Sequence, residues 1–592
     1  MVGILALALM AVAPPSLADR LVVMKTREAA LGGIHVAEVL CGGQVVVRLR
    51  SKTASVRARA DRAAEALSTA LLAGLARPDL SVAAAPNDEA AVRAGATTIV
   101  VADRETAKLS SSTPAALAAA WVKGIRAALK EPYLAIGGDT SLLVPIGESR
   151  YLRYGGPLGR TLRAESSAPD VARVAVEAAE RRLSFSGASR GVAIGTLHAG
   201  RADLTLQIEA KKWAAVIRAS ATGTLTGRAH AEDLARRVVA NAALCGVTPE
   251  PGAGVEVTSI EGADPTYSVT VVASGEEYIE AKRAVSVSIR RTQPPDSQPI
   301  DVLVSNSPER IPSRGCLLRE QIDATRPVRL LYHHLNASDE PLLFVIRVTN
   351  TGRECGTVHV SLGEAGPDVD ELSTGHAAAK RFWEQLLSGS GYLLQVPPGC
   401  ASDIVRTLIP RNAIVSGLGT ITPLTPGPLY LEICAERPQS VNRWLELTPE
   451  KLPEAPKLTN FRFGAAKVIE AEHQIGGKWT FITIGREGSV SDAGHQLAGD
   501  YGVLHEVAIG LVNPTPNPGK VEITVRASGG LMRGFFLIDG VLHETGVLRG
   551  FNEEVLTKEE VPPNGGRILR LLTMPESASN YPIHLVVRST TS

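Results

Sequence analysis

The sequence predicts a multi-domain, mainly β protein in which a small α/β N-terminal domain is followed by serial antiparallel β-sandwich domains. Three observations lead to this fold class. The 592 residues exceed what one hydrophobic core can organise. Glycine and proline are abundant, at 55 and 37 residues, as in chains with many short strands and turns. From residue 250 onward, many segments alternate apolar and polar residues at the two-residue period of strands.

The first domain is expected over residues 19–132 and alternates strands with helices. The segments GGQVVVRLRS and TTIVVAD are predicted strands. A helix is predicted over residues 54–78, where alanine and leucine recur along one face and a proline ends the pattern. A second helix is predicted to begin at the capping residue Thr113, with Pro114 in its first turn, and to end by Pro132. This order of elements predicts a small two-layer domain.

Residues 133–225 are predicted to form a β-sandwich. An apolar strand leads to IGESRYL, and SSAPDVARV, LSFSGASRGVAIGTL and a closing AAVIRAS follow. The positions that carry this outline are Gly147, Pro169, Val171, Val174, Gly187, Gly191 and Gly195. The outline resembles bacterial Ig-like domains of the BIG type and the N-terminal domain of pilus-assembly secretin proteins, which implies an Ig-like sandwich used for display or assembly outside the cytoplasm, without catalytic residues. The stretch PDVARVAVEAAERRL leaves an alternative open, because its period also fits a helix.

The rest of the chain is predicted to contain three further regions, divided by polar, proline-containing linkers. Residues 226–291 combine one helix with short strands. Residues 300–440 form a β-rich domain that is interrupted by one helix, about His376–Leu387. Residues 460–592 form a C-terminal β-sandwich, in which Asp539-Gly540 predicts a tight hairpin because a type I′ turn needs positive φ. The expected linkers are Thr292–Pro299 and Glu450–Asn460.

The N-terminal segment MVGILALALMAVAPPSLADR is predicted to be a signal peptide over residues 1–18. Val2–Val12 is apolar and Ser16-Leu17-Ala18 matches a small-x-small pattern, so cleavage is expected after Ala18. The alternative is a buried N-terminal strand or helix. No later segment reaches about eighteen consecutive apolar residues, which predicts no transmembrane segment after signal cleavage. We therefore expect an exported protein that is periplasmic, secreted or on the cell surface.

The six cysteines fit an oxidising compartment, and four of them crowd into one predicted domain. Because no two cysteines have the CxxC spacing, a zinc ribbon or thioredoxin motif is not indicated. We expect two disulfides within residues 300–440, and the sequence leaves all three pairings open. Cys41 and Cys245 could form a pair or remain two buried thiols. The disulfide candidates are Cys316, Cys355, Cys400 and Cys434.

One candidate metal or acid/base site lies between residues 330 and 376. LLYHHLNASDE carries two adjacent histidines, and GPDVDELSTGH brings acidic residues and a third histidine. Adjacent side chains of a strand face opposite sides, so only one of His333 and His334 can serve a common site, and the mixed residues predict partial cover on each face. The acids also have a structural explanation, since carboxylates stabilise helix N-termini. The candidate metal ligands are His333, His376, Asp368 and Asp370.

Two short motifs have structural explanations. GASRG, at Gly187–Gly191, matches the G-x-S-x-G nucleophile elbow, but a strand rather than a helix is predicted after Ser189. We therefore interpret Ser189 as a turn residue. Asn336-Ala337-Ser338 matches the N-glycosylation pattern. We interpret this match as coincidental, because the signal peptide is of bacterial type.

Composition and motifs together favour a non-catalytic role. The formal net charge is +1 with acids and bases interspersed, which is not typical of a nucleic-acid binder. No Rossmann, phosphate-loop, zinc-protease or calcium-loop motif is present, so no cofactor is indicated. The main hypothesis is an exported bacterial cell-envelope or surface protein that binds or assembles with other envelope proteins or wall components. The alternatives are a secreted or periplasmic metal-dependent hydrolase centred on residues 333–376 and a carbohydrate- or wall-binding adhesin, which the 4% aromatic content disfavours.

Overall fold

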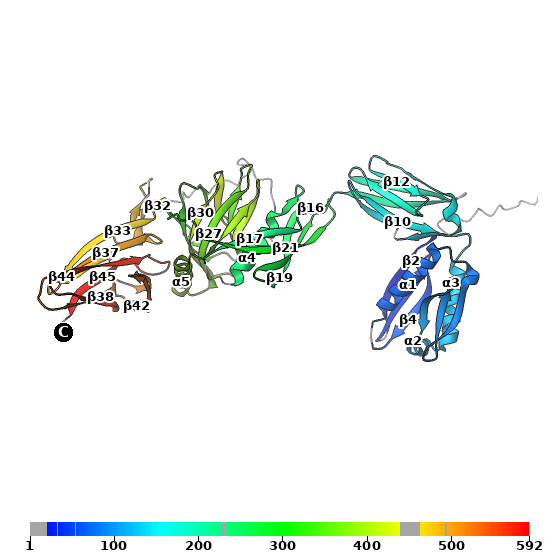
Figure 1. Ribbon diagram of the computed structural model, residues 1–592, viewed down its shortest axis with the longest axis horizontal. Helices are drawn as coiled ribbons and strands as arrows, with labels where there is room; N and C mark the ends of the chain where they lie inside the picture. The colour runs from blue at the N-terminus through cyan, green and yellow to red at the C-terminus, as the bar shows by residue number, and fades with distance from the viewer. Residues whose placement is uncertain are drawn as a thin grey trace, which may run out of the picture. The chain divides into compact units, whose positions relative to one another are not determined.

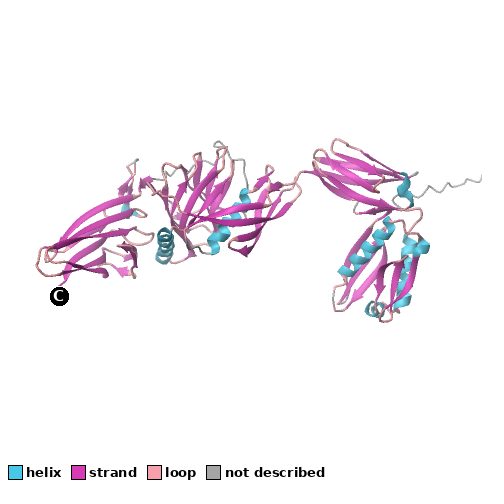
Figure 2. Ribbon diagram, in the orientation of Figure 1, coloured by secondary structure: helices cyan, strands magenta, loops and turns pink. Residues whose placement is uncertain are grey.

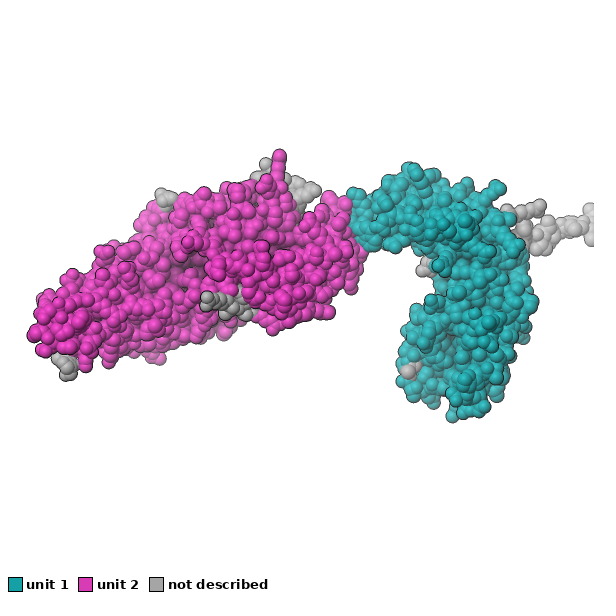
Figure 3. All heavy atoms as spheres, viewed as in Figure 1, with its two compact units in different colours: residues 1–213, 276–279 teal, residues 214–275, 280–592 magenta. Residues whose placement is uncertain are grey.

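The structure, a computed structural model, divides the chain into two compact units (Figure 3). The first unit comprises residues 1–213 and 276–279, and the second comprises residues 214–275 and 280–592. Strands dominate both units (Figure 2), which confirms the predicted multi-domain, mainly β fold class. The predicted signal peptide and the predicted linker Glu450–Asn460 lie outside the described residues. The described residues are 21–590 except 32, 54, 139, 200–201, 228–231, 439–461 and 492–493.

The first unit begins with an α/β layer, as the sequence predicts. Its elements are β2 Met24–Leu31, β3 Ile34–Cys41, β4 Gln44–Ser51, α1 Arg57–Leu72, β5 Leu80–Ala85, β6 Glu89–Ala94, β7 Thr97–Ala102, α2 Arg104–Leu109 and α3 Pro114–Ala128. The strands form the sheets β2–β3–β4 and β5–β6–β7. α1 contacts β2 and β3, whereas α3 contacts β4, β5 and β6 (Figure 1). Leu67 and Leu71 from α1 and Trp121 and Ile125 from α3 share one buried core.

The ends of the two long helices in this layer have local causes. The Thr113 hydroxyl accepts a hydrogen bond from the Ala116 N–H at 3.2 Å at the start of α3, so the predicted cap is confirmed. α1 ends at Leu72, earlier than predicted. Gly74, with a φ of +96°, stops the helix because this backbone conformation favours glycine. A separate 3₁₀ turn, Arg77–Asp79, follows.

The second part of the first unit is a β-sandwich, as the resemblance to bacterial Ig-like domains implies. One sheet consists, in order, of β1 Leu21–Val22, β8 Leu134–Gly137, β10 Ser149–Gly155, β13 Arg182–Gly187 and β12 Ala172–Glu177. The other consists, in order, of β11 Leu162–Ser166, β14 Gly191–Ala199, β15 Ala202–Lys211 and β9 Ser141–Pro145. The stretch PDVARVAVEAAERRL contains β12, which pairs with β13, so its helical alternative is wrong. Leu183, Phe185, Leu206 and Ile208 belong to the core of this sandwich.

The second unit contains an eleven-stranded sheet that crosses two predicted regions. Its strands, in order, are β19 Gly254–Ala263, β20 Thr266–Ser274, β21 Ala281–Thr292, β17 Ser220–Thr226, β28 Gly391–Val396, β27 Gly356–Asp368, β30 Ile414–Pro423, β25 Val328–Asn336, β22 Asp301–Ser305 and β32 Arg462–Gly464, with β23 Arg310–Ile311 paired to β25. α4 Glu232–Cys245 contacts β17 and β28, and α5 Glu371–Ser388 contacts β27 and β30 (Figure 1). The predicted linker Thr292–Pro299 therefore joins two strands of one sheet.

A four-stranded sheet packs on this large sheet and completes a sandwich. Its strands, in order, are β24 Gly315–Ile322, β31 Leu429–Glu436, β26 Leu342–Asn350 and β29 Ala401–Ile409. The Phe344 ring of β26 lies 5.3 Å from the Tyr332 ring and 5.7 Å from the His334 ring of β25, measured between centroids. These contacts place β26 over one face of β25.

The second unit ends in the predicted C-terminal β-sandwich. One sheet consists, in order, of β33 Ala466–Gln474, β37 Leu504–Asn513, β44 Gly565–Thr573, β40 Phe535–Ile538 and β41 Val541–Glu544. The other consists, in order, of β34 Thr480–Ile484, β45 Ile583–Thr590, β38 Gly519–Ala527 and β43 Glu553–Val561. Asp539 and Gly540 connect β40 to β41 with φ of +44° and +88°, which confirms the predicted hairpin. Short paired strands complete the unit: β16 Ala215–Ile217 with β18 Val247–Pro249, β35 Ser489–Val490 with β36 Gln496–Leu497, and β39 Leu531–Met532 with β42 Leu548–Arg549.

Candidate functional site

The histidine doublet lies on β25, a strand inside the large sheet. All nine residues of β25 are buried, so the partial cover predicted for both of its faces is wrong. The alternation of side chains holds, because Leu331 packs in a cluster with Phe382 of α5 whereas His334 lies beside Phe344 of β26. His333 shares the side of Leu331, so the two histidines face different layers.

His334 is a structural histidine with both ring nitrogens engaged. Its Nδ1 donates to the Pro308 carbonyl at 3.0 Å, and the Ser305 hydroxyl donates to its Nε2 at 3.0 Å. Burial lowers the pKa of His334 to about 4, which keeps the imidazole neutral at neutral pH. His334 is not among the predicted metal ligands, and its contacts give it a structural role.

His333 lies near the beginning of α5. Its Nδ1 is buried and has no hydrogen-bond partner among the described residues. Burial lowers the pKa of His333, although the charges of Glu309 and Glu371 oppose this shift. Glu371 is the first residue of α5, so the acidic groups that act on His333 differ from the predicted partners Asp368 and Asp370.

Asp368 and Asp370 form the turn that leads into α5. The helix begins at Glu371 with Asp370 as its N-cap, earlier than the predicted start at His376. The Asp370 carboxylate accepts hydrogen bonds from the Ser373 N–H at 3.0 Å and from the Ser373 hydroxyl at 2.8 Å, and these bonds lower the pKa of Asp370. Asp368 accepts a hydrogen bond from the Val369 N–H at 2.6 Å. Both acids therefore have the structural role that the sequence offered as the alternative.

His376 lies in the second turn of α5 and contacts the C-terminal sandwich. Its Nδ1 is 2.8 Å from Oε1 of Glu576, and its Nε2 is 2.9 Å from Oε1 of Glu544. The imidazole stacks on the Phe535 ring, with 4.6 Å between centroids and 12° between planes. Lys380, one turn further along α5, forms an ion pair with Oε2 of Glu544 at 2.8 Å. We call His376, Lys380, Glu544 and Glu576 the His376 cluster.

The electrostatics of the His376 cluster favour a bound proton between His376 and Glu576. Burial by itself would lower the pKa of His376, but the hydrogen bond and charge of Glu576, with a contribution from Glu544, outweigh it and raise the pKa. Burial raises the pKa of Glu576, against the opposing effect of His376. Lys380 and then His376 lower the pKa of Glu544. The cluster therefore acts as a charge-assisted contact between α5 and the sandwich, in which the His376–Glu576 pair is buried and Lys380 and Glu544 are more exposed.

Two further contacts join the same layers. Phe382 and Trp383 of α5 pack with residues of the C-terminal sandwich in one buried cluster. On β25, the buried guanidinium of Arg329 donates to the carbonyl oxygens of Ala465 at 2.7 Å and Gly502 at 3.0 Å. Burial lowers the pKa of Arg329 to about 10, which still leaves it charged at neutral pH. His376 and Arg329 thus help to hold the two sandwiches of the second unit together.

The structure gives the predicted metal ligands separate roles. His333 faces the start of α5, Asp368 and Asp370 form its N-terminal turn, and His376 is engaged by two glutamates. Within the described ranges, no group of three or more His, Cys, Asp and Glu side chains could hold a metal ion. A metal bound by His333, His376, Asp368 and Asp370 stays a prediction, which chelation can test.

Three buried asparagines at strand ends make the same hydrogen bonds, and the sequence reading did not identify them. In each, Oδ1 accepts the N–H two residues ahead, while Nδ2 donates to the carbonyl four residues ahead and to a carbonyl of another segment. The signal was present as NASDE, NTGRE and NPTPN, each directly after an apolar strand. We call these residues the asparagine clamps: Asn336, Asn350 and Asn513.

The two short motifs have the structural roles that we inferred. Asn336 is buried and its Nδ2 donates to the carbonyls of Glu340 at 2.9 Å and Ile409 at 3.0 Å, so its amide is not accessible as a glycosylation acceptor. The Ser189 hydroxyl donates to the Asp170 carbonyl at 2.7 Å. The strand β14 follows Ser189, so the geometry of a nucleophile elbow is absent from this described segment.

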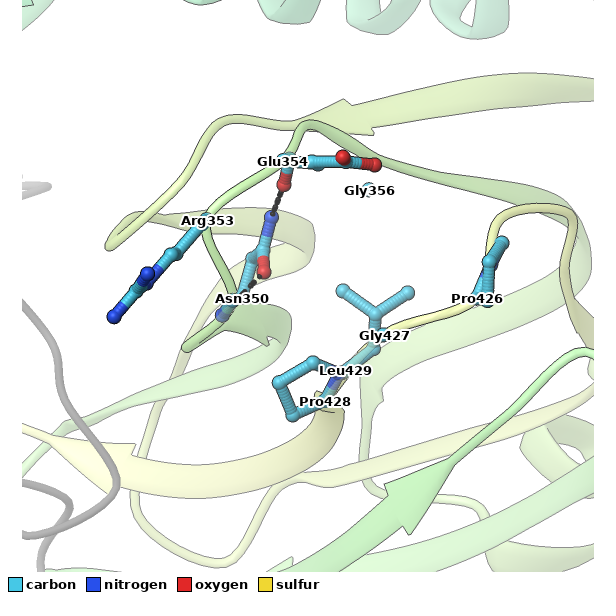
Figure 4. A pocket seen from close by; sticks show the side chains of 9 residues that line it. Asn350, Arg353, Glu354, Gly356, Pro426, Gly427, Pro428 and Leu429 are labelled. Carbon is cyan, nitrogen blue, oxygen red and sulfur yellow. Dashed lines mark hydrogen bonds between the residues drawn. The ribbon is translucent and has the colours of Figure 1, made fainter.

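A small cavity of about 260 Å³ opens beside the Asn350 clamp (Figure 4). The Asn350 amide points to the Glu354 backbone, and Arg353 extends away from Leu429 in this view. The volume is below the roughly 300–1,000 Å³ typical of small-molecule sites, and the Asn350 amide is already engaged, so the cavity does not indicate a ligand. Its lining consists of Asn350, Gly352, Arg353, Glu354, Gly356, Pro426, Gly427, Pro428 and Leu429.

Exposed aromatic and half-buried basic side chains gather on the outer surface of the sheet β34–β45–β38–β43. Trp479 and Phe481, at its edge strand β34, are 53% and 51% exposed. The Arg588 guanidinium of β45 lies 5.4 Å from the centre of the Trp479 ring, and that of Arg526 on β38 lies 5.9 Å from the centre of the exposed Phe551 ring. We call these five residues the C-terminal outer face.

Comparison with known proteins gives limited similarity. No protein family profile matches the chain, and no curated protein matches it. Domains 5–6 of the S-layer protein SbsC are 11% identical, with 26% of this chain and 96% of that chain covered and a TM-score of 0.13. Lac15 from a marine microbial metagenome is 12% identical, with 76% of this chain and 88% of that chain covered and a TM-score of 0.10. The insect immune protein hemolin is 9% identical, with 32% of this chain and 61% of that chain covered and a TM-score of 0.14.

The helices add one observation about membranes. None of those in the described part of the chain combines the length and apolar character that a membrane crossing requires.

Proposed function

We propose that this chain is an exported protein of the bacterial cell envelope or surface, and that it acts by binding or assembling with other envelope proteins. In the region of the predicted metal site, His376 and Arg329 make buried contacts with the C-terminal sandwich. Exposed recognition groups are found elsewhere, on the C-terminal outer face. That face is the observation on which the proposed binding role rests.

The composition and order of the C-terminal outer face suit a protein interface. Tryptophan and arginine are enriched among the residues that dominate binding energy in such interfaces. Glu522 and Glu553 hold Arg588 through ion pairs of 2.7 and 2.9 Å. Arg588 in turn lies over the Trp479 ring. Because these side chains are already oriented, less conformational entropy is lost when a partner binds.

A protein partner fits this face better than a sugar does. Sugars bind exposed tryptophan by stacking on the open ring, and the Arg588 guanidinium already lies against one face of Trp479. The arginines and glutamates also offer directional hydrogen bonds around the aromatic groups. We therefore assign the face to an envelope protein and keep the wall-binding adhesin as an outcome of the test.

Export and assembly rest on the predicted signal peptide and on the sandwich of residues 133–225. The predicted signal peptide supports a location outside the cytoplasm. The sequence outline of residues 133–225, which resembles bacterial Ig-like domains and the N-terminal domain of pilus-assembly secretins, supports a role in assembly there.

The test combines cell fractionation with cross-linking of the full chain carrying a C-terminal tag. We expect the chain in the envelope or the medium and a protein cross-linked to it. The double variant Trp479→Ser, Phe481→Ser is expected to lose that cross-link. Val468→Ser is the matched control, because Val468 is also strongly exposed but lies on β33 of the other sheet.

Three results would reject the proposal in different ways. A cytosolic location contradicts export. A cross-link that both variants retain contradicts the C-terminal outer face. Retention of the chain on purified cell wall, lost in the double variant and without a protein cross-link, supports the adhesin alternative instead.

A further inference from the structure

The six cysteines are in the thiol form in the structure, and five of them fall into two groups. Cys316 on β24 and Cys434 on β31 are direct partners in the antiparallel register. Cys245, Cys355 and Cys400 form the second group, around the end of β28. The Cys245 thiol donates to the Gln395 carbonyl, Gly356, the residue after Cys355, pairs with Val396, and the Cys400 N–H donates to the Pro397 carbonyl. The sixth, Cys41, is buried in the core of the first unit.

Cys316 and Cys434 meet the distance requirement of a disulfide. Residues directly opposite each other in an antiparallel pair have Cα atoms about 4.5–5.5 Å apart, within the roughly 4.4–6.8 Å that a disulfide spans. An interaction between the two thiols lowers the pKa of Cys316 and raises that of Cys434. Their sulfur atoms therefore face each other across the two strands.

The Asn350 clamp brings the segments of Cys355 and Cys400 together. The Asn350 N–H donates to the Cys400 carbonyl at 2.8 Å. Its Nδ2 donates to the carbonyl of Glu354, the residue before Cys355, at 2.7 Å. One buried residue thus fixes the backbone on both sides of a Cys355–Cys400 pair. The Cys245 thiol instead donates to the Gln395 carbonyl at 3.1 Å.

We propose that Cys316 forms a disulfide with Cys434, that Cys355 forms a disulfide with Cys400, and that Cys41 and Cys245 remain thiols. Of the three pairings that the sequence leaves open, this one joins the register partners. The Cys316–Cys434 disulfide links β24 to β31 within the four-stranded sheet. The Cys355–Cys400 disulfide ties the start of β27 to the turn before β29.

The chemistry is thiol–disulfide exchange with a low-molecular-weight disulfide or a disulfide-donating oxidase. In each pair, one thiolate attacks a sulfur of the oxidant and forms a mixed disulfide, and the first oxidant thiolate leaves. The second cysteine then attacks its partner's sulfur, forms the protein disulfide and releases the second oxidant thiolate. Two protein thiols are oxidised, one oxidant disulfide is reduced to two thiols, and the two cysteine protons pass to them.

The test uses the purified full chain equilibrated with oxidised and reduced glutathione, so it does not depend on where the protein resides in the cell. Remaining thiols are alkylated under denaturing conditions, and peptides are mapped by mass spectrometry without reduction. We expect a Cys316–Cys434 peptide, a Cys355–Cys400 peptide, and alkylated Cys41 and Cys245. Failure of this map leaves the proposed binding function untouched, because that function rests on the C-terminal outer face.

A second measurement compares melting temperatures with and without reductant. The oxidised wild type is expected to lose several degrees on reduction. The double variant Cys316→Ala, Cys434→Ala should show a smaller reductant-dependent shift, whereas Cys41→Ala should show the wild-type shift. Each variant is compared with itself, with and without reductant, so a change in its intrinsic stability does not affect the result. The proposal is overturned if all four cysteines in residues 300–440 are alkylated, or if Cys316 is linked to Cys355 or Cys400. A Cys245–Cys355 peptide overturns the second pair.

Discussion

Nδ1 of His376, on helix α5, lies 2.8 Å from Oε1 of Glu576, in the C-terminal sandwich. Both side chains are buried, at 5% and 1% exposure. The contact joins residues that are 200 positions apart in the sequence. It makes the packing of α5 on the sandwich dependent on the protonation of one buried pair, because a proton bound there satisfies both groups at once.

His376→Gln is expected to destabilise the second unit in a pH-dependent way. The pKa of His376 is raised in the folded state, so its stabilising effect is fully present below its ordinary pKa of about 6.5 and is lost as pH rises through the raised value. We expect a loss of about 3 kcal/mol in the free energy of unfolding at pH 6, and a smaller loss at pH 9. Urea denaturation of both proteins at the two pH values measures this.

His495→Gln serves as the control for this prediction. His495 is exposed and lies outside the His376 cluster, in the same unit. We expect less than about 0.5 kcal/mol at either pH. A loss for His376→Gln that is the same at pH 6 and pH 9 would show that its imidazole contributes only by packing.

Asp500→Asn is expected to remove a stabilising charge inside the C-terminal sandwich. Burial opposes ionisation of Asp500, but hydrogen bonds from His505, Lys467 and Ser489 outweigh it and lower its pKa to about 2. A lowered carboxyl pKa contributes stability above the ordinary value, and this contribution is lost as pH falls through the folded value. We expect a loss of roughly 2 kcal/mol at pH 6.5 and clearly less at pH 3.

Asn is a suitable replacement for Asp500 because it tolerates the positive φ of +53° at this position. Asp296→Asn, at an exposed position of the same unit, is the control and should change stability little at both pH values. Chemical denaturation followed by circular dichroism provides the measurement. An equal effect of Asp500→Asn at pH 3 and pH 6.5 would contradict the assigned ionisation.

Asn513→Ala is expected to lower the free energy of unfolding by about 3 kcal/mol. The Asn513 amide donates to the carbonyls of Asn517, Val561 and Pro562 and accepts from Thr515, so its removal leaves several backbone groups without partners. Asn552→Ala removes an exposed amide of the same sandwich and should cost less than about 0.5 kcal/mol. Comparable losses in urea titrations of the two variants would refute the clamp as a stabilising unit.

Asp370→Ala separates a helix cap from a metal ligand. As an N-cap of α5, Asp370 is expected to contribute about 1 kcal/mol, equally with and without chelator. We also expect the melting temperature of the wild type to be unchanged by chelator. If a metal co-purifies, and if chelator lowers the melting temperature of the wild type but not that of Asp370→Ala, the metal site of residues 333–376 gains support.

Local features of the fold could be predicted because they depend on neighbours in the sequence. The Thr113 cap and Pro114 specify the start of α3, and Asp539-Gly540 specifies a hairpin through its backbone preference. Alternating apolar residues located the strands of the C-terminal sandwich. Helix α5 starts at Glu371 rather than at the predicted His376, because Asp370 caps it.

The candidate site was less predictable, because its members meet only through packing. The sequence brought His376 close to Asp368 and Asp370, but the fold pairs it with Glu576 and Glu544. Each asparagine clamp follows a recognisable pattern in the sequence. The carbonyl oxygens on other strands that accept its hydrogen bond, such as those of Val396 and Val561, have no such pattern. The outer position of Trp479 likewise depends on which face of its sheet covers the core.

The sequence by itself determined the mainly β fold class, many of the strands and the start of α3, because backbone preferences and alternating hydrophobicity act over a few residues. The tertiary structure alone decided which strands share a sheet, as in the large sheet that crosses the predicted linker Thr292–Pro299. It also decided that Cys316 opposes Cys434 and that His376 lies against Glu576. Such contacts depend on strand register and on the packing of layers, which a single sequence specifies only through the whole fold.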